Sequence, residues 1–298
     1  MVEQNLFRPA GVFTAKTPRV VAASKLHRAR ARKKTGTFLA EGINSVEAAV
    51  RSGAVRQIFA TELAWQQYRA QLEVAASGTG DAVTEGSHGA LELNLIDESA
   101  VSALADTVTS TGLFAVCDTA VVLNDVASVL ANSSPARPVV VAVDCQDPGN
   151  AGTLIRLTDA LGAAGVVFTG DSVDPVGAKV VRSSAGSIFG VPVARDPDFR
   201  AVFSQLAGAE ITALLTTLDG SVSLSYQELP AKPVAWVFGN EAHGLTEEVL
   251  QAVEEQQLDA VRVSIPIVGT AESLNLATAA AICLWETARG KSGSCSNV

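Results

Sequence analysis

The chain has 298 residues, of which 48% are hydrophobic and 18% charged, so it can hold two domains with sizeable cores. No apolar run approaches the roughly 18 residues that span a bilayer, and the first residues lack the apolar stretch of a signal peptide, so we expect a cytoplasmic protein without a membrane partner. The net charge of −9 at pH 7, taken alone, argues against a nucleic-acid partner.

The N-terminal part of the chain departs from this average. Residues 1–16 are irregular and contain Pro9 and Gly11, which predicts a flexible tail, and a helix is expected to follow and to end at Gly36. Residues 4–40 hold nine basic and no acidic residues, while the rest of the chain carries 13 basic and 31 acidic residues. Such a separation of sign indicates that one face contacts a polyanion, and a basic arm without a specific partner is the alternative.

Short strands and helices alternate in the next segment. "TFLAEG" and "VRQIFAT" are typical of strands, "INSVEAAVRSG" of an amphipathic helix that ends at Gly53, and "LFAVCD" of a closing strand. The alternation predicts a small α/β domain over residues 17–117. Residues 125–138, "DVASVLANSSPARP", combine polar residues with two prolines, which indicates a linker, and we place it at residues 118–136.

The C-terminal half has a cleaner alternation. Strand-like runs occur at "VVVAVDC", "GVVFTG", "VPVA", "ITALLTT", "AWVFGN" and "VRVSIPI", and helix-like segments separate most of them. Nearly continuous apolar strands are typical of a parallel sheet covered by helices on both faces, so we predict an α/β domain over residues 137–290 and a disordered tail over residues 291–298. Open sheets of this kind bind ligands at the carboxyl ends of their strands.

The first of these strand ends precedes "QDPGNAGTLIRLTDALGA". Pro148 turns the chain, and Asn150 stands where a helix cap would be. Arg156 is about 200° around the helix from Leu154, so it projects away from the packed face. An arginine there could bind a phosphate bidentately, and a solvated surface arginine is the alternative.

The second strand end is "AWVFGNEAHGL". Gly239 and Gly244 bracket a polar turn and allow a ligand to approach the backbone. Glu241 is either a site residue or an acid favoured by the dipole of the following helix, and His243 is either a base or polar surface.

The third strand end is "IPIVGTAESLNLATAAAICLWE". Ser273 or Asn275 could cap the final helix. That helix is apolar almost all round, so it must be covered on every side, by a second subunit or by the core of a monomer.

The sequence predicts no metal site. Its four cysteines, Cys117, Cys145, Cys283 and Cys295, have no metal-ligand spacing, so free thiols in a reducing compartment fit best. It also has no phosphate-binding loop, which disfavours an unrelated nucleotide-binding α/β enzyme.

The order and spacing of the three turns resemble the SpoU branch of the SPOUT superfamily, the TrmH-like RNA ribose 2'-O-methyltransferases that use S-adenosylmethionine. "DPGNAGTLIRLTDALG", "VFGNEAHGL" and "IPIVGTAESLNLATAAAICLWE" are similar to the family's three motifs, and "KVVRSSAGSIFGVPV" to a segment between the first two. The resemblance covers about residues 137–290 and extends weakly over residues 17–117. It implies a trefoil-knotted methyltransferase domain, preceded by an L30e-like substrate-binding domain, in a homodimer built through the knot helices.

The resemblance also assigns roles. It implies S-adenosylmethionine as the cofactor, held by Thr216, Gly239, Ile265 and Leu274, and a polar catalytic and structural set of Asn150, Arg156, Glu241, Ser273 and Asn275. The family proposal makes the arginine a base, but a guanidinium is almost always charged. We therefore expect Arg156 to bind the adjacent phosphate and to stabilise developing alkoxide charge, while phosphate or water takes the proton.

RNA would be the partner, bound by the basic segment and recognised by loop shape and unstacked bases. The N-terminal domain favours ribosomal RNA; a transfer RNA enzyme and a non-catalytic RNA-binding or ribosome-assembly protein are the alternatives. "TSTGLFAV" departs from the resemblance, with Thr111 where many relatives have a glutamine. The predicted RNA-binding residues are Lys25, Arg28, Arg30, Arg32, Lys33 and Lys34.

Overall fold

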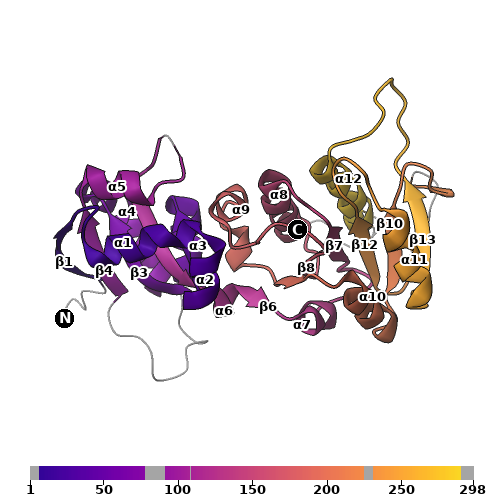
Figure 1. The fold of residues 1–298 in the computed structure, drawn as a ribbon, viewed down its shortest axis with the longest axis horizontal. Helices are drawn as coiled ribbons and strands as arrows, with labels where there is room; N and C mark the ends of the chain where they lie inside the picture. The colour runs from indigo at the N-terminus through magenta and orange to yellow at the C-terminus, as the bar shows by residue number, and fades with distance from the viewer. Residues whose placement is uncertain (1–6, 78–90, 108, 225–230, 290–298) are drawn as a thin grey trace, which may run out of the picture. The chain divides into compact units, whose positions relative to one another are not determined.

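The computed structural model describes residues 7–77, 91–107, 109–224 and 231–289. The chain divides into two compact units, one comprising residues 1–122 and 176–190 and the other residues 123–175 and 191–298 (Figure 1). The segment 176–190, which contains α9 and η2, thus belongs to the first unit. This segment lies within the domain predicted over residues 137–290, and the tail predicted over residues 291–298 lies outside the described residues.

The first unit is an α/β unit with a five-stranded mixed sheet, in the order β1-β4-β3-β5-β2. β1, β4 and β3 run parallel, and β5 is antiparallel to both of its neighbours. Its elements are β1 (Phe7–Phe13), α1 (Pro18–Ser24), η1 (Lys25–His27), α2 (Ala29–Thr35), β2 (Thr37–Glu41), α3 (Ile43–Arg51), β3 (Val55–Ala60), α4 (Glu62–Ser77), β4 (Leu91–Ile96), α5 (Glu98–Leu104), β5 (Leu113–Asp118), α6 (Thr119–Val122), α9 (Ala178–Ser183) and η2 (Ser187–Phe189).

The flexible tail expected over residues 1–16 is wrong for residues 7–13. These residues form β1 and pair with β4, from Phe7 opposite Leu91 to Phe13 opposite Ile96. The register shifts between Pro9 and Val12, which explains why the segment has no regular alternation. Its partner strand lies some 80 residues away in sequence, so local pattern could not reveal the pairing.

The helix expected up to residue 35 is divided into α1, η1 and α2. Val20, Ala23 and Leu26 recur at helical spacing and are buried in a core that includes β4 and α5. As predicted, Gly36 ends the segment: its φ of 64° is left-handed, and its N–H bonds to the Arg32 carbonyl.

The second unit contains an eight-stranded sheet whose pairings are all parallel, in the order β11-β13-β10-β12-β7-β8-β9-β6. This agrees with the parallel sheet predicted from the apolar runs. Its elements are β6 (Leu123–Asn124), α7 (Val126–Ala131), β7 (Val139–Val143), α8 (Pro148–Ala160), β8 (Gly165–Thr169), β9 (Val193–Asp196), α10 (Phe199–Gly208), β10 (Thr212–Thr216), β11 (Val222–Ser223), β12 (Val234–Phe238), α11 (Glu247–Glu255), β13 (Ala260–Ser264) and α12 (Leu276–Arg289).

Helices cover both faces of this sheet. Alternate residues such as Val141, Leu215 and Val237 pack in one core with α7, α10 and α11. On the other face, α8 packs against α12 (Figure 1). The buried Trp236 of β12 donates from Nε1 to Thr287 Oγ1 of α12 at 2.9 Å. Burial on both faces explains why the central strands have no polar alternation.

The linker expected over residues 118–136 is also corrected. It contains the last residue of β5, together with α6, β6 and α7, and Val126, Val129 and Leu130 of α7 are buried in the core of the second unit. Asp125 caps α7, since its side chain accepts from the Ser128 N–H at 2.7 Å. The segment was predicted to be a linker because a polar cap beside a short helix has the mixed composition that is typical of linkers.

Of the helices in the described ranges, none combines the length and apolar character needed to cross a membrane.

Candidate functional site

Two of the polar turns lie side by side at one edge of the second unit's sheet. β7 ends at Val143 and β12 at Phe238, and these parallel strands are neighbours, with Phe238 opposite Ala142. The turns that follow, residues 144–150 and 239–244, therefore leave the sheet at the same edge. The convergence of the first two predicted turns is confirmed.

Glu241 connects the second turn to the first. Its Oε1 accepts from the Asp147 N–H and the Asn150 Nδ2, both at 3.1 Å, and its Oε2 accepts from the Gln146 N–H at 3.3 Å. The buried thiol of Cys145 lies 3.6 Å from Oε1. Burial acts to raise the pKa of the Glu241 carboxyl, but the hydrogen bonds from Asn150 and backbone N–H groups hold it below its ordinary value. Glu241 is therefore an ionised acceptor, and it does not cap the following helix, whose N-cap is Thr246.

The third turn joins through Asn275. Its Nδ2 donates to Asn150 Oδ1 at 3.1 Å, and its Oδ1 accepts from the Ala277 and Thr278 N–H groups at 2.9 and 3.3 Å, at the start of α12. The predicted capping role of Asn275 is thus confirmed. Glu241, Asn150 and Asn275 form a continuous series of hydrogen bonds, here called the polar chain. Because a carboxylate only accepts, it orients the Asn150 amide, which in turn orients that of Asn275.

Asn150 does not cap α8 as expected. The N-cap is Asp147, whose side chain accepts from the Asn150 N–H at 2.8 Å. Pro148 occupies the first turn, where a missing N–H costs no helical hydrogen bond. The Asn150 side chain is thereby free to link Glu241 to Asn275.

Arg156 and Ser273 do not join the polar chain. Both side chains are exposed and form no hydrogen bond or ion pair with a described residue. Arg156 lies six residues after Asn150 in α8, about 9 Å along the helix axis. It projects away from the buried Leu154 and Ile155, as its helical position predicted.

The four expected cofactor residues lie at or beside the same edge. β10 is hydrogen-bonded between β12 and β13, so Thr216, Gly239 and Ile265 stand at or just beyond the carboxyl ends of three neighbouring strands. Thr216 Oγ1 donates to the Val237 carbonyl at 2.9 Å. Leu274 immediately precedes Asn275 of the polar chain. Only glycine fits at position 239, because a Cβ there would collide with the returning backbone of Gly244 and Leu245.

Some polar groups at this edge have no hydrogen-bond partner among the described residues. The buried hydroxyls of Thr217 and Ser223 find no hydrogen-bond partner among the described residues. No hydrogen bond to a described residue is recorded for residues 265–274, which project from the second unit between β13 and α12 (Figure 1). Buried polar groups are normally paired, so these two hydroxyls are candidates for ligand contacts. The backbone of residues 265–274 is mostly exposed, so its polar groups are open to solvent or to a ligand.

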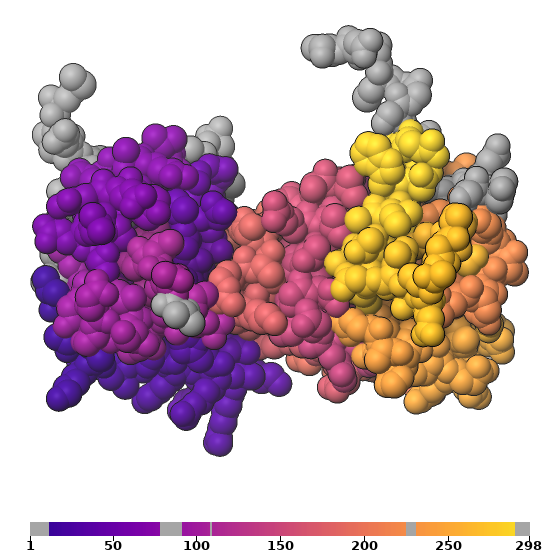
Figure 2. Space-filling model, turned by 90° about the horizontal axis from the view of Figure 1, so that it is seen from above, coloured from indigo at the N-terminus to yellow at the C-terminus, as the bar shows by residue number. Residues whose placement is uncertain are grey.

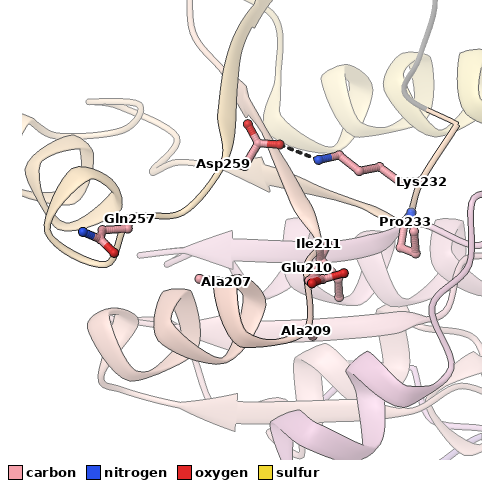
Figure 3. Close-up of a pocket in the computed structure, with 8 residues that line it drawn as sticks. All are labelled: Ala207, Ala209, Glu210, Ile211, Lys232, Pro233, Gln257 and Asp259. Atoms are coloured by element: carbon pink, nitrogen blue, oxygen red, sulfur yellow. Dashed lines mark hydrogen bonds and ion pairs between the residues drawn. The ribbon is translucent and has the colours of Figure 1, made fainter.

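The opposite edge of the sheet holds a separate groove of about 510 Å³ (Figure 3). The ion pair between Lys232 Nζ and Asp259 Oδ2, at 2.6 Å, lies in this groove, and Thr212 Oγ1 also donates to Asp259 at 2.9 Å. The groove lies where β10, β12 and β13 begin, so it is distinct from the three turns. Its lining residues are Ala207, Ala209, Glu210, Ile211, Lys232, Pro233, Gln257 and Asp259.

The basic segment of the first unit presents most of its charges to solvent, and Figure 2 shows long side chains of the indigo part of the chain projecting from this unit. Arg30, Lys33 and Lys34 recur at helical spacing on the exposed side of α2. Lys25 and Arg28 are also exposed.

Arg32 is a correction to the predicted RNA-binding set. Its side chain is only 7% exposed, and its Nη1 donates to the Leu26 and His27 carbonyls at 2.8 and 3.0 Å. At 100° per residue it lies about 160° around α2 from Arg30 and Lys34 and about 100° from Lys33. Arg32 ties η1 to α2. A helical wheel could have separated it from the other three.

Sequence reasoning also missed partners in the first turn. Cys145, Gln146 and Asp147 contact Glu241, and the Asn240 side chain reaches the Asp144 carbonyl at 2.9 Å. The only feature of the sequence that could have pointed to Asn240 as a site residue is its position between Gly239 and Glu241. Across the described ranges, no group of three or more His, Cys, Asp or Glu side chains is arranged to hold a metal ion.

Comparisons with known families match both parts of the chain. Residues 137–285 match the model of the SpoU rRNA Methylase family, and residues 17–115 match that of the MRM3-like substrate binding domain. The first match contains all three turns and the whole polar chain.

Individual proteins are similar over nearly the full length. The 23S rRNA (guanosine(2553)-2'-O)-methyltransferase RlmP of Bacillus subtilis is 31% identical over 92% of this chain and 97% of its own. The crystal structure of an AdoMet-bound rRNA methyltransferase from Sinorhizobium meliloti is 26% identical, with a TM-score of 0.76 over 96% of this chain and 99% of its own. The crystal structure of the SpoU methyltransferase AviRb of Streptomyces viridochromogenes, in complex with AdoMet, is 25% identical. Its TM-score is 0.74, and the match covers 93% of this chain and 98% of its own.

Proposed function

The chain belongs to the SpoU rRNA methylase family, and from this premise we propose that it is an S-adenosylmethionine-dependent methyltransferase that acts on a ribose 2'-hydroxyl in ribosomal RNA. The observation that carries the proposal is the polar chain, because it joins the three turns of the family-matched region through Glu241, Asn150 and Asn275. The ribosomal substrate is supported by the name of the full-length Bacillus relative.

The residues present suit the cofactor. S-adenosylmethionine supplies an electrophilic methyl group when bound. We propose that Thr216, Gly239, Ile265 and Leu274 hold it, mainly through backbone groups. One observation supports this assignment: the buried hydroxyl of Thr217, next to Thr216 in sequence, has no hydrogen-bond partner among the described residues.

Arg156 is proposed to contact the substrate. Its exposed guanidinium has no partner among the described residues, so it is available to a phosphate. Bound there, it would align the 2'-hydroxyl and stabilise the negative charge that develops on its oxygen. Phosphate or water would take the proton, because a guanidinium remains charged. Asn150, Glu241 and Asn275 would hold the turns in place, and Ser273, two residues before Asn275 in the third turn, would be a further contact.

The decisive experiment is methyl transfer from S-adenosylmethionine labelled in its methyl group. The purified protein would be incubated with total RNA from cells that lack the gene, and ribose methylation would be mapped by resistance to alkaline cleavage. One strongly modified position in ribosomal RNA is expected. Modification of transfer RNA alone would redirect the substrate assignment. Tight cofactor binding by calorimetry without methylation of any RNA would favour the non-catalytic alternative.

The exposed charges of the first unit are proposed to bind RNA phosphates. Changing Arg30, Lys33 and Lys34 together to alanine is expected to weaken RNA binding and to reduce the slope of log Kd against log salt by about 2 to 3, one counterion contribution for each lost contact. Fluorescence anisotropy over a salt series would measure both quantities. The matched control changes Arg51, Arg56 and Arg69, whose charges are already paired with Glu47, Asp118 and Glu73. An equal reduction in this control would show that only total charge matters.

A homodimer formed through α12, a trefoil knot and a cytoplasmic location are further proposals from the family. Trp285 of α12 is 57% exposed, and Ile282 lies beside it at helical spacing and is only partly buried. Such an aromatic residue is a typical centre of an interface.

Changing Trp285 to glutamate is therefore expected to convert the dimer to monomers, because a charge would be buried against an apolar surface. Light scattering during size-exclusion chromatography would measure the mass. Val74→Glu, at another exposed apolar position, on α4, is the control and is expected to leave the dimer intact. A monomeric wild-type protein would contradict the proposal directly.

A further inference from the structure

Asn240 closes the second turn on itself. Its backbone exchanges two hydrogen bonds with Gly244, both at 2.9 Å, which form an isolated antiparallel bridge. Its Oδ1 accepts from the Ala242 and His243 N–H groups at 2.8 and 3.3 Å. The turn that carries Glu241 is therefore organised around Asn240 rather than around regular secondary structure.

The remaining polar group of Asn240 reaches the first turn. Its Nδ2 donates to the Asp144 carbonyl at 2.9 Å. Asp144 is itself held in place: its φ of 53° is left-handed, and its Oδ1 accepts from the Asp171 N–H at 2.6 Å after β8. Asn240 thus binds to a point that is restrained from the neighbouring strand.

The two attachments are consecutive in sequence. Asn240 holds the second turn to residue 144, and Glu241 holds it to residues 146–150. A single hydrogen bond would let the turn rotate, whereas two attachments to different points of the first turn define the direction of the carboxylate. We propose that Asn240 is a positioning residue for methyl transfer, which orients Glu241 so that it can hold Asn150 and the polar chain. The effect on methyl transfer rests on the proposed function, whereas the contacts of Asn240 and Glu241 with the first turn do not depend on it.

The test is Asn240→Asp. This isosteric change keeps the oxygen that accepts from Ala242 and His243, but it replaces the donor to Asp144 with an acceptor that faces a carbonyl oxygen. At neutral pH we expect kcat/KM for RNA methylation to fall about 10- to 100-fold, because the partly buried Asp144 carbonyl would lose its donor and face a second acceptor. Once the introduced carboxyl is protonated it can donate again, so activity relative to wild type should recover as the pH falls. Its pKa is expected to exceed the ordinary 3.9, because it lies near the carboxylate of Glu241.

The recovery is measured as the ratio of kcat/KM of the variant to that of wild type at each pH. The ratio isolates residue 240, because both proteins share the other titratable groups around this turn. These groups are Asp144, Cys145, Asp147, Asp171, Glu241 and His243. Asn240→Ala lacks any donor and is expected to remain impaired at every pH. A merely structural loss would give both variants the same flat ratio.

Asn124→Asp is the matched control. Asn124 is exposed in β6, and its Oδ1 accepts from the Val193 N–H at 3.3 Å, so the same change is expected to leave the ratio near one. A flat ratio for Asn240→Asp, or an equal recovery of Asn240→Ala, would overturn the positioning role. If wild type fails to methylate RNA, the proposed function fails instead. The melting temperatures of the two Asn240 variants over the same pH range would then still test the contact with Asp144.

Discussion

Glu241→Ala is expected to reduce kcat/KM for RNA methylation by about 100- to 1,000-fold, because Gln146, Asp147 and Asn150 would each lose an acceptor in one step. Without the carboxylate, nothing dictates which way the Asn150 amide faces, so its bond to Asn275 weakens as well. Glu241→Gln retains one oxygen and is expected to lose less, because its new amide group faces only the Gln146 N–H. Steady-state kinetics with saturating cofactor would measure both variants.

Two further observations would support this account of Glu241. Glu247→Ala, which removes an exposed carboxylate from the first turn of α11, is expected to change activity little. Since the hydrogen bonds hold the pKa of the Glu241 carboxyl below its ordinary value, its contribution to stability is complete above that ordinary value. The contribution is lost as the pH falls through the lowered pKa. Wild type and Glu241→Gln should therefore approach each other in stability in acid, and parallel loss at all pH values would contradict an ionised acceptor.

Arg156→Ala is expected to reduce kcat by about 100- to 1,000-fold, the usual effect of removing one electrostatic contact to a developing negative charge. The affinity for S-adenosylmethionine should change little, because Arg156 is exposed on α8 and is assigned to the substrate phosphate. Rapid-quench methylation assays and calorimetry would separate the two quantities. Equal losses in cofactor affinity and in rate would place Arg156 in the cofactor pocket instead.

Arg156→Lys distinguishes a bidentate phosphate contact from a point charge. Lysine keeps the charge but lacks the planar fork, so an activity at least about tenfold below wild type is expected. A lysine variant with most of its activity and an unchanged acidic limb of the pH-rate profile would count against the bidentate contact. Arg137→Ala is the control: this exposed arginine lies just before β7, at the opposite edge of the sheet.

Several features of the fold could be predicted because local sequence determines them. The runs around Val141, Leu214 and Val237 are apolar at nearly every position, which is possible in a strand only if both faces are buried. A parallel sheet brings its turns to one edge, and the family motifs identified which turns matter. The polar side chains chosen there included all three members of the polar chain.

Other features depended on partners far away in sequence. The Asn150 amide contacts Glu241 and Asn275, which are 91 and 125 residues distant, whereas its local position suggested a cap. β1 looked irregular because its order comes from pairing with β4. Arg32 looked like its basic neighbours, yet it satisfies two carbonyls inside the unit.

The sequence by itself determined the class of fold, the apolar strands and the polar turns, because hydrophobic periodicity and turn chemistry act over a few residues. Only the tertiary structure decided which polar groups form hydrogen bonds with one another. Hydrogen bonds act over about 3 Å, and the positions of Asn240 beside Asp144 and of Glu241 beside Asn150 depend on how β7 and β12 pair.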